Sequence, residues 1–169
     1  MAATQPRIRE LQRDECERIL ARNHVGRMAY ARHNRVDIEP LHYVFHDGWI
    51  YGRTSHGAKL EATGYEWWPV AFEVDEVEDV FRWRSVVVHG GFYTLNEYGA
   101  DWESAEWRQG VELLREIVPE TMAEGDPAPH RRVLFRIAVQ EVTGREAEPA
   151  GGEAGEPGVH AASEPESAG

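Results

Sequence analysis

The residue types best suited to ligand chemistry stand together in Thr54-Ser55-His56-Gly57-Ala58-Lys59. Two hydroxyls precede a pair of small residues that lets a ligand approach the backbone, and the chain's only lysine follows one helical turn later. Free N–H groups at a helix N-terminus, hydroxyls and an ammonium group are donors that bind phosphate. The segment therefore predicts a phosphate-binding site. The alternative interpretation is an ordinary capped helix with a solvated lysine.

Other sequence patterns that carry chemistry are missing. Neither the Walker pattern nor the Gly-x-Gly-x-x-Gly of dinucleotide-binding folds occurs, and there is no Gly-x-Ser-x-Gly nucleophile elbow. His42 and His46 have a spacing that would suit a metal on a helix, but their segment alternates like a strand, in which four residues span roughly 13 Å. Cys16 stands alone on an amphipathic helical segment. We therefore expect no metal site and no acyl-enzyme chemistry.

Alternating apolar residues predict an antiparallel β-protein around the phosphate-binding segment. A short helix is expected over 15–21 with Asp14 as its N-cap, another over 57–63, and a third over 101–118 that packs on the sheet. Six antiparallel strands with a few helices imply a closed or nearly closed barrel, which leaves no free sheet edges. The expected strands cover residues 24–31, 36–45, 49–53, 68–74, 83–95 and 133–142.

Two places in these strands predict a break in regular pairing. The apolar positions change phase within residues 36–45, and the switch falls at Pro40. A bulge or kink there would stand beside an active site or at a barrel corner, and the two interpretations are compatible. Gly90-Gly91 predicts a second bulge or a sharp bend in the long fifth strand.

Length and charge indicate one domain followed by a tail. The chain has 169 residues, and we place the domain at residues 1–145. Residues 146–169 contain almost only Glu, Ala, Gly, Pro and Ser, which predicts a disordered acidic tail that buries too little apolar surface to fold. The formal net charge of −12 disfavours nucleic acid and membranes as partners. A single cysteine and the lack of a long apolar run lead us to expect a cytoplasmic protein.

Five pieces of sequence, in this order, carry a family resemblance. They are Val25-Gly26-Arg27-Met28-Ala29, the run from Ile38 to Tyr51, Gly57-Ala58-Lys59-Leu60, the run from Trp83 to Gly90, and Val142-Thr143-Gly144-Arg145. Between residues 9 and 145 the chain resembles the pyridoxamine 5′-phosphate oxidase-like family of FMN-binding split barrels, particularly its nitroimidazole-resistance branch. The resemblance implies a mainly β fold, a six-stranded antiparallel split β-barrel with flanking helices and a disordered C-terminal tail.

The resemblance also implies where a cofactor binds. FMN would lie at the interface of a homodimer, with its phosphate at residues 54–59, one ring edge against the backbone at 40–42, and residues 84–85 on the other side of the site. The implied cofactor-binding residues are Pro40, Leu41, His42, Arg53, Thr54, Ser55, Gly57, Ala58, Lys59, Arg84 and Ser85.

The function that the resemblance implies is electron transfer from NADH or NADPH to a small molecule. FMN carries such chemistry and the protein supplies position and electrostatics, so no catalytic side chain is assigned. Members of the nitroimidazole-resistance branch carry a histidine just after the third strand's tyrosine, whereas Gly52 and Arg53 follow Tyr51 here. This departure argues against nitro-group reduction more than against FMN binding. The alternatives on the same fold are a non-catalytic flavin or haem binder and a deazaflavin-dependent reductase.

Overall fold

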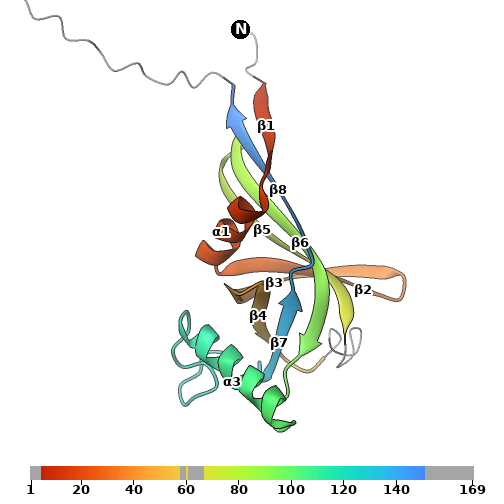
Figure 1. Cartoon of the computed structure of the whole chain (residues 1–169), viewed down its shortest axis with the longest axis vertical. Helices are drawn as coiled ribbons and strands as arrows, with labels where there is room; N and C mark the ends of the chain where they lie inside the picture. The colour runs from red at the N-terminus through yellow and green to blue at the C-terminus, as the bar shows by residue number, and fades with distance from the viewer. Residues whose placement is uncertain (1–4, 58–59, 61–66, 151–169) are drawn as a thin grey trace, which may run out of the picture.

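The computed structural model describes residues 5–57, 60 and 67–150, which form a β-barrel with two flanking helices and a projecting arm (Figure 1). The order of the described elements is β1 (Pro6–Leu11), α1 (Arg13–Arg22), β2 (Val25–Arg32), β3 (Arg35–His46), β4 (Trp49–Thr54), β5 (Trp68–Asp79), β6 (Arg82–Thr94), α3 (Asp101–Arg115), β7 (Val133–Ala138) and β8 (Glu141–Pro149).

Six strands pair edge to edge in the order β6-β5-β2-β3-β4-β7, and all of these pairs are antiparallel. Residues 92–94 of β6 also pair with residues 135–137 of β7, which joins the two ends of the row into a ring. The predicted fold class, a six-stranded antiparallel split β-barrel with flanking helices, is therefore confirmed.

The arm is an extension of this sheet that the sequence analysis missed. β8 pairs with residues 83–89 of β6, and β1 pairs with β8 (Figure 1). The sequence of β1 contains charged residues where a strand pattern would alternate polar and apolar residues, so this strand was not predicted. The single strand predicted over 133–142 is interrupted at Val139-Gln140 and divided between β7 and β8. β8 continues to Pro149, so the domain boundary predicted after Arg145 falls inside a strand and residues 146–149 belong to the sheet.

Aromatic and aliphatic side chains fill the barrel. Tyr43, Phe72 and Phe92 are fully buried, and the rings of Tyr43 and Phe72 meet edge-on with 5.0 Å between their centroids. The Tyr43 hydroxyl donates a hydrogen bond to the carbonyl oxygen of Leu20 at 2.7 Å, which ties α1 to the barrel, and burial raises the pKa of Tyr43. Burial also raises the pKa of the Cys16 thiol on α1, which disfavours the reactive thiolate.

The helices differ from the prediction at their ends. α1 begins at Arg13, where the backbone N–H of Gln12 donates to the Glu15 carboxylate at 2.8 Å, so Asp14 lies within the first turn and is not the N-cap. α3 ends at Arg115 and packs through Val111, Leu113 and Leu114 against β4 and β7. The helix predicted over 57–63 lies almost entirely outside the described residues.

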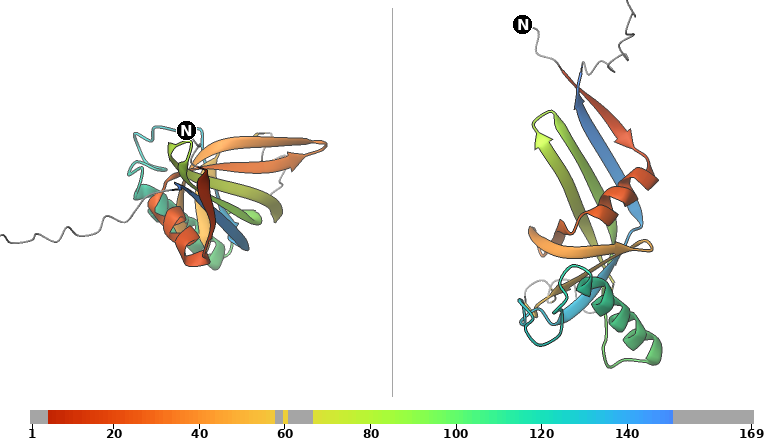
Figure 2. Two further views of the ribbon diagram at one scale, coloured as in Figure 1. Left: turned by 90° about the horizontal axis from the view of Figure 1, so that it is seen from above. Right: turned by 90° about the vertical axis from the view of Figure 1, so that its left-hand side faces the viewer.

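The outward face of β2, of β5 and of residues 35–40 of β3 has no covering layer in the part of the chain that the structure describes, whereas Val44 farther along β3 is buried against α3. α1 packs against β8, β3 and β6, and α3 packs against β4, β7 and β3, while the β2–β3 hairpin projects away from both helices (Figures 1 and 2). Val36 and Ile38 on this face are 72% and 63% exposed. Ile38, Ala29 and Ala71 lie side by side across three strands, which makes the face partly apolar.

The bulge predicted at Pro40 is wrong. The β2–β3 ladder runs from His42 to Arg35 without a register shift. The apolar phase changes because Val36 and Ile38 point outward, whereas Leu41 points into the barrel. Proline is tolerated at this position because β4 pairs with β3 only from Tyr43 onward, so this edge of β3 needs no donor.

Gly90-Gly91 lies where β6 changes its pairing partner from β8 to β7. The pairing of β6 with β5 continues through both glycines without the predicted bulge. β6 pairs with β8 up to His89 and with β7 from Phe92. A Cβ atom on Gly90 would lie 1.7 Å from the carbonyl oxygen of Ala138, and one on Gly91 would lie 1.9 Å from Nε1 of Trp67. Close approach of other chain segments therefore explains both glycines.

Candidate functional site

The predicted ring-binding segment of β3 presents its side chains to two different sides. Pro40 and His42 are exposed on the outward face, whereas Leu41 is buried inside the barrel. Arg27 of β2 is the cross-strand neighbour of Pro40 and is held by Glu73 at 3.1 Å and Asp75 at 2.9 Å. Of the three predicted residues 40–42, only Pro40 and His42 expose their side chains to a ligand on this face.

The predicted phosphate segment begins at the end of β4. Thr54 is buried, Ser55 is half-buried, and Gly57 is exposed, with no atom of the described residues within 4 Å of the position that a Cβ would take. Ala58 and Lys59 lie outside the described residues, so their predicted role stays a prediction. The described part of the segment has open space beside Gly57, as a bound phosphate requires.

Arg53, predicted as a cofactor-binding residue, is engaged by Asp126. Its two terminal nitrogens donate to the Asp126 carboxylate at 2.5 and 2.8 Å, and the two side chains are only 10% and 6% exposed. The carboxylate also accepts hydrogen bonds from the backbone N–H groups of Met122 and Ala128. Hydrogen bonding to the Arg53 guanidinium holds the pKa of Asp126 well below its usual range. This pair fastens the segment between α3 and β7 to β4.

A small cleft lies between β3, β4 and that segment. His42, Arg53 and Arg131 give it a basic character, and its volume is about 30 Å³. Its apolar wall comes from the end of α3 and the residues after it. The remaining lining residues are Leu114, Ile117, Val118, Thr121 and Ala128. The cleft accommodates water or a small protruding group, but it is too small for a whole cofactor.

Arg84 and Ser85, predicted together on one side of the cofactor, point to opposite faces of β6. Arg84 stands in a row of alternating charge between Glu76 of β5 and Glu146 of β8, its direct cross-strand neighbours, and the row continues to Arg9 of β1, which neighbours Glu146. Glu146 is 4% exposed and contacts Arg84 at 2.6 Å and Arg9 at 2.5 Å. Arg84 therefore holds the arm together, on the face that α1 approaches.

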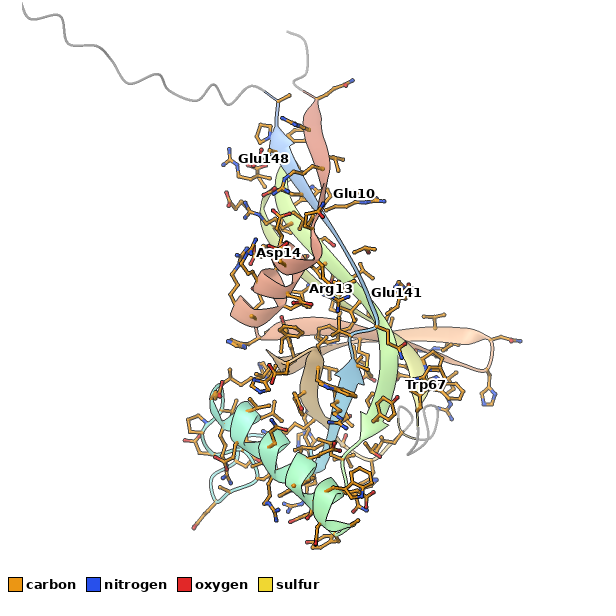
Figure 3. The ribbon with its side chains drawn as sticks, viewed as in Figure 1. Glu10, Arg13, Asp14, Trp67, Glu141 and Glu148 are labelled. Carbon is orange, nitrogen blue, oxygen red and sulfur yellow. The ribbon has the colours of Figure 1, made fainter. Side chains whose placement is uncertain are left out.

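Ser85 lies on the other face, in a cleft of about 690 Å³ formed by β1, β6, β8 and the start of α1. Trp83 and Val87 flank it along β6, and Arg145 of β8 is its cross-strand neighbour. Figure 3 labels Glu10 and Arg13, which border the same cleft where β1 passes into α1. The volume falls within the range of ligand pockets. The predicted site residues thus belong to two separate areas of one subunit, one on β3 and β4 and one on β6.

The barrel, its arm and the two clefts define the class of split-barrel proteins, and solved structures share this fold. An FAD-binding protein from Mesorhizobium loti is 30% identical, with 83% of this chain and 99% of that chain covered and a TM-score of 0.66. A proposed 5-nitroimidazole antibiotic resistance protein from Bacteroides thetaiotaomicron is 14% identical, with 85% and 91% covered and a TM-score of 0.62. An FAD and haem binding protein from Mycobacterium smegmatis is 14% identical, with 83% and 75% covered and a TM-score of 0.62. The last two similarities concern the fold alone.

The family follows from the sequence match. The model of the pyridoxamine 5′-phosphate oxidase family matches residues 12–146, and the chain belongs to this family. The predicted family resemblance is therefore confirmed. Among curated proteins, no sequence matches the chain.

Three features of the site escaped the sequence analysis. Asp126 lies in a segment without regular alternation, so nothing indicated that it would meet Arg53. Arg145 and Thr143 belong to a strand that was not predicted as a separate element. Had β8 been predicted to pair with β6 in its observed register, Arg145 and Thr143 would have been placed beside Ser85 and Val87. The sequence Val142-Thr143-Gly144-Arg145, which contributes to the family resemblance, was the signal that could have indicated this strand. No helix in the described part of the chain is long and apolar enough to cross a membrane.

Proposed function

We propose that this chain is the subunit of a homodimeric, cytoplasmic flavoprotein that binds FMN and passes electrons from NADH or NADPH to a small-molecule acceptor. The observation that carries this proposal is the division of the predicted site residues between two areas of one subunit. A cofactor that contacts both areas is best accommodated between two copies of the chain, each of which contributes one area. The uncovered face of β2, β3 and β5 offers the surface for such a pairing.

The described residues fit a flavin. The open space at Gly57 suits the phosphate, with donors from Ser55 and the neighbouring backbone. The exposed backbone at Pro40 and the cleft around Ser85 offer flat, partly apolar surfaces to a ring. Arg53 and Arg84 are engaged by Asp126 and Glu146, so we expect both to support the site without contacting the cofactor.

The bound flavin would accept a hydride from the nicotinamide and deliver electrons to the acceptor. The chain's own residues bind and orient both partners. Trp83 and Val87 exclude water from one wall of the site, and His42 and Arg131 make the small basic cleft that admits an acidic group of the second substrate. No proton transfer by a side chain is required.

A second candidate cofactor is FAD, because the Mesorhizobium loti protein, 30% identical over 83% of this chain, is an FAD-binding protein. A non-catalytic flavin or haem carrier and a deazaflavin-dependent reductase are further alternatives on this fold.

The cofactor and the activity are tested on the purified protein. Mass spectrometry of the extracted cofactor should give FMN, and the loaded protein should oxidise NADH or NADPH when an acceptor such as a quinone is added. If the extracted cofactor is FAD, haem or a deazaflavin, the assignment of FMN is wrong and that group is the cofactor. If the protein binds FMN but oxidises neither NADH nor NADPH, the proposed oxidoreductase activity is contradicted and the protein is a non-catalytic flavin carrier.

A further inference from the structure

The small basic cleft between β3, β4 and the segment after α3 contains two cationic side chains that are not engaged elsewhere. Arg131 is half-buried and His42 is exposed, and neither side chain forms an ion pair or a hydrogen bond within residues 5–57, 60 and 67–150. Arg53 differs, because both of its terminal nitrogens donate to Asp126. None of the described residues that line the cleft is acidic. The cleft therefore offers a positive charge and N–H donors to a bound anion.

The turn that carries Arg131 is held by the same carboxylate that engages Arg53. The backbone N–H of Arg131 donates to the carbonyl oxygen of Ala128 at 3.0 Å, and the N–H of Ala128 donates to Asp126 at 2.9 Å. The backbone of Arg131 is thus fixed while its guanidinium stays available. An arginine positioned before its ligand arrives loses less conformational freedom on binding, which favours affinity.

The size of the cleft restricts the kind of anion. A space of roughly 10–15 Å³ holds one water-sized atom. With a volume of about 30 Å³, the cleft has room for about two such atoms, which matches the two oxygens of a carboxylate. A phosphate or a sulfonate presents three terminal oxygens in a tetrahedral arrangement, and the third exceeds this space. The volume therefore selects a carboxylate.

The walls of the cleft determine what the carboxylate is attached to. Apart from the basic residues and Thr121, the lining is apolar and consists of Leu114, Ile117, Val118 and Ala128. The Thr121 hydroxyl donates to the carbonyl oxygen of Val118 at 2.7 Å, so its proton is not available to a ligand. Apolar walls exclude water and strengthen the attraction between a guanidinium and an anion. They offer no partner to further polar groups, so the part of the ligand next to the carboxylate is expected to be apolar.

We propose that the guanidinium of Arg131, together with His42, binds the carboxylate of the electron acceptor, so that the acceptor is a small organic acid with an apolar body. This inference rests on the proposed function and names the substrate class that it left open. His42 also belongs to residues 40–42, against which the cofactor ring is expected, so an acceptor anchored here would extend toward that ring. The carboxylate is an anchor and takes no part in electron transfer.

Binding of benzoate to the purified protein tests the carboxylate site without any turnover, and ligand-observed NMR measures the affinity. Arg131→Gln should weaken benzoate by about tenfold, because a charge-assisted hydrogen bond is lost. Arg131→Lys, which keeps the charge, should recover part of this loss. Arg132→Gln is the matched control, since Arg132 is exposed and lies outside the lining, and it should bind benzoate like the wild type.

Two further comparisons test the size of the anion and the identity of the acceptor. Benzenesulfonate and inorganic phosphate should bind the wild type more weakly than benzoate. In the FMN-loaded protein, a quinone with a carboxymethyl side chain should have a lower KM than its methyl ester, and Arg131→Gln should raise the KM of the acid toward that of the ester.

The outcomes separate the inference from the function on which it rests. If the loaded protein oxidises NADH or NADPH but Arg131→Gln matches the wild type with benzoate and with the acid, the inference alone is overturned. Tighter binding of benzenesulfonate or phosphate than of benzoate would overturn the carboxylate class. If benzoate binding depends on Arg131 but no quinone is reduced, the proposed function fails, and the assignment of the carboxylate to an electron acceptor fails with it.

Discussion

At the scale of single residues, Asp126 is the centre of the contacts that close one side of the site. It accepts four hydrogen bonds, two from Arg53 and one each from the backbone of Met122 and Ala128. Met122 has a positive φ of 58°, which a non-glycine residue adopts at some cost in free energy. The hydrogen bond from its N–H to Asp126 helps to maintain that conformation.

Asp126→Asn should lower the free energy of unfolding by about 3 kcal/mol, because it leaves a buried arginine without its counter-charge. Urea unfolding at neutral pH measures the change. Asp47→Asn is the matched control, since the Asp47 side chain is 87% exposed, and it should leave the midpoint unchanged. Equal stability of Asp126→Asn and the wild type would show that the pair contributes nothing.

The same carboxylate gives a prediction about pH. Its pKa in the folded protein lies below the unfolded value of about 3.9. Its contribution to stability is therefore fully present above about pH 5 and is lost progressively as the pH falls toward the folded pKa. The stability difference between wild type and Asp126→Asn should shrink below about pH 4. A difference that grows on acidification would contradict this sign.

At the scale of elements, the arm depends on charge pairs that continue past the predicted end of the domain. Glu146 of β8 is buried between Arg9 of β1 and Arg84 of β6. Glu76 of β5 joins the same network through Arg84 at 3.7 Å and also accepts hydrogen bonds from Arg22, the last residue of α1, and from Asn23 after it. Hydrogen bonding to Arg22 lowers the pKa of Glu76 to about 2. Five elements are thus held by one continuous set of contacts.

Two truncations test this account of the arm. A chain that ends at Ala150 keeps all of β8 and should melt at the wild-type temperature. A chain that ends at Arg145 loses Glu146 and four of the six β1–β8 residue pairs, so its melting temperature should fall by several degrees. Calorimetry measures both. Identical melting of the two truncations would show that residues 146–149 are dispensable.

Strands and helices with a regular pattern of apolar and polar residues were predictable from the sequence. Elements whose conformation depends on contacts with distant parts of the chain were not. The strands β2 to β6 and helix α3 follow from their apolar patterns and turn residues. β1 carries arginines on one face and a glutamate on the other, because the strand beside it is charged, so its pattern resembles that of a loop. Among the site residues, the position of His42 was predictable, but the separation of Arg84 from Ser85 depends on the register of β8.

At the scale of the whole molecule, the unusual feature is the uncovered sheet face. The two described helices lie on other sides of the barrel, away from the β2–β3 hairpin (Figure 2). A groove of about 580 Å³ lies on this face between Trp67 and Val36, lined mostly by small and apolar residues, with His89, Gln140 and Glu141 along one edge. Exposed apolar surface of this kind is typical of a subunit interface.

Ile38→Asp should convert the proposed dimer into a monomer, because it places a charge in the centre of this face. Sedimentation velocity at micromolar concentration measures the change. Tyr98→Asp is the control, because Tyr98 is 89% exposed in the segment before α3, away from the face, and it should remain dimeric. Monomeric wild-type protein, or dimeric Ile38→Asp, would contradict the assigned interface.

The central claim, a flavin held by its phosphate at residues 54–59, is tested most directly by titrating cofactor-free protein with FMN and riboflavin, in the wild type and in Lys59→Ala. The wild type should bind FMN at one molecule per subunit. Lys59→Ala should weaken FMN by roughly tenfold to a hundredfold, since a charge-assisted hydrogen bond contributes about 1.5–3 kcal/mol. Riboflavin should bind both proteins alike. Wild-type protein that binds neither ligand, or a Lys59→Ala variant with unchanged FMN affinity, would contradict the claim.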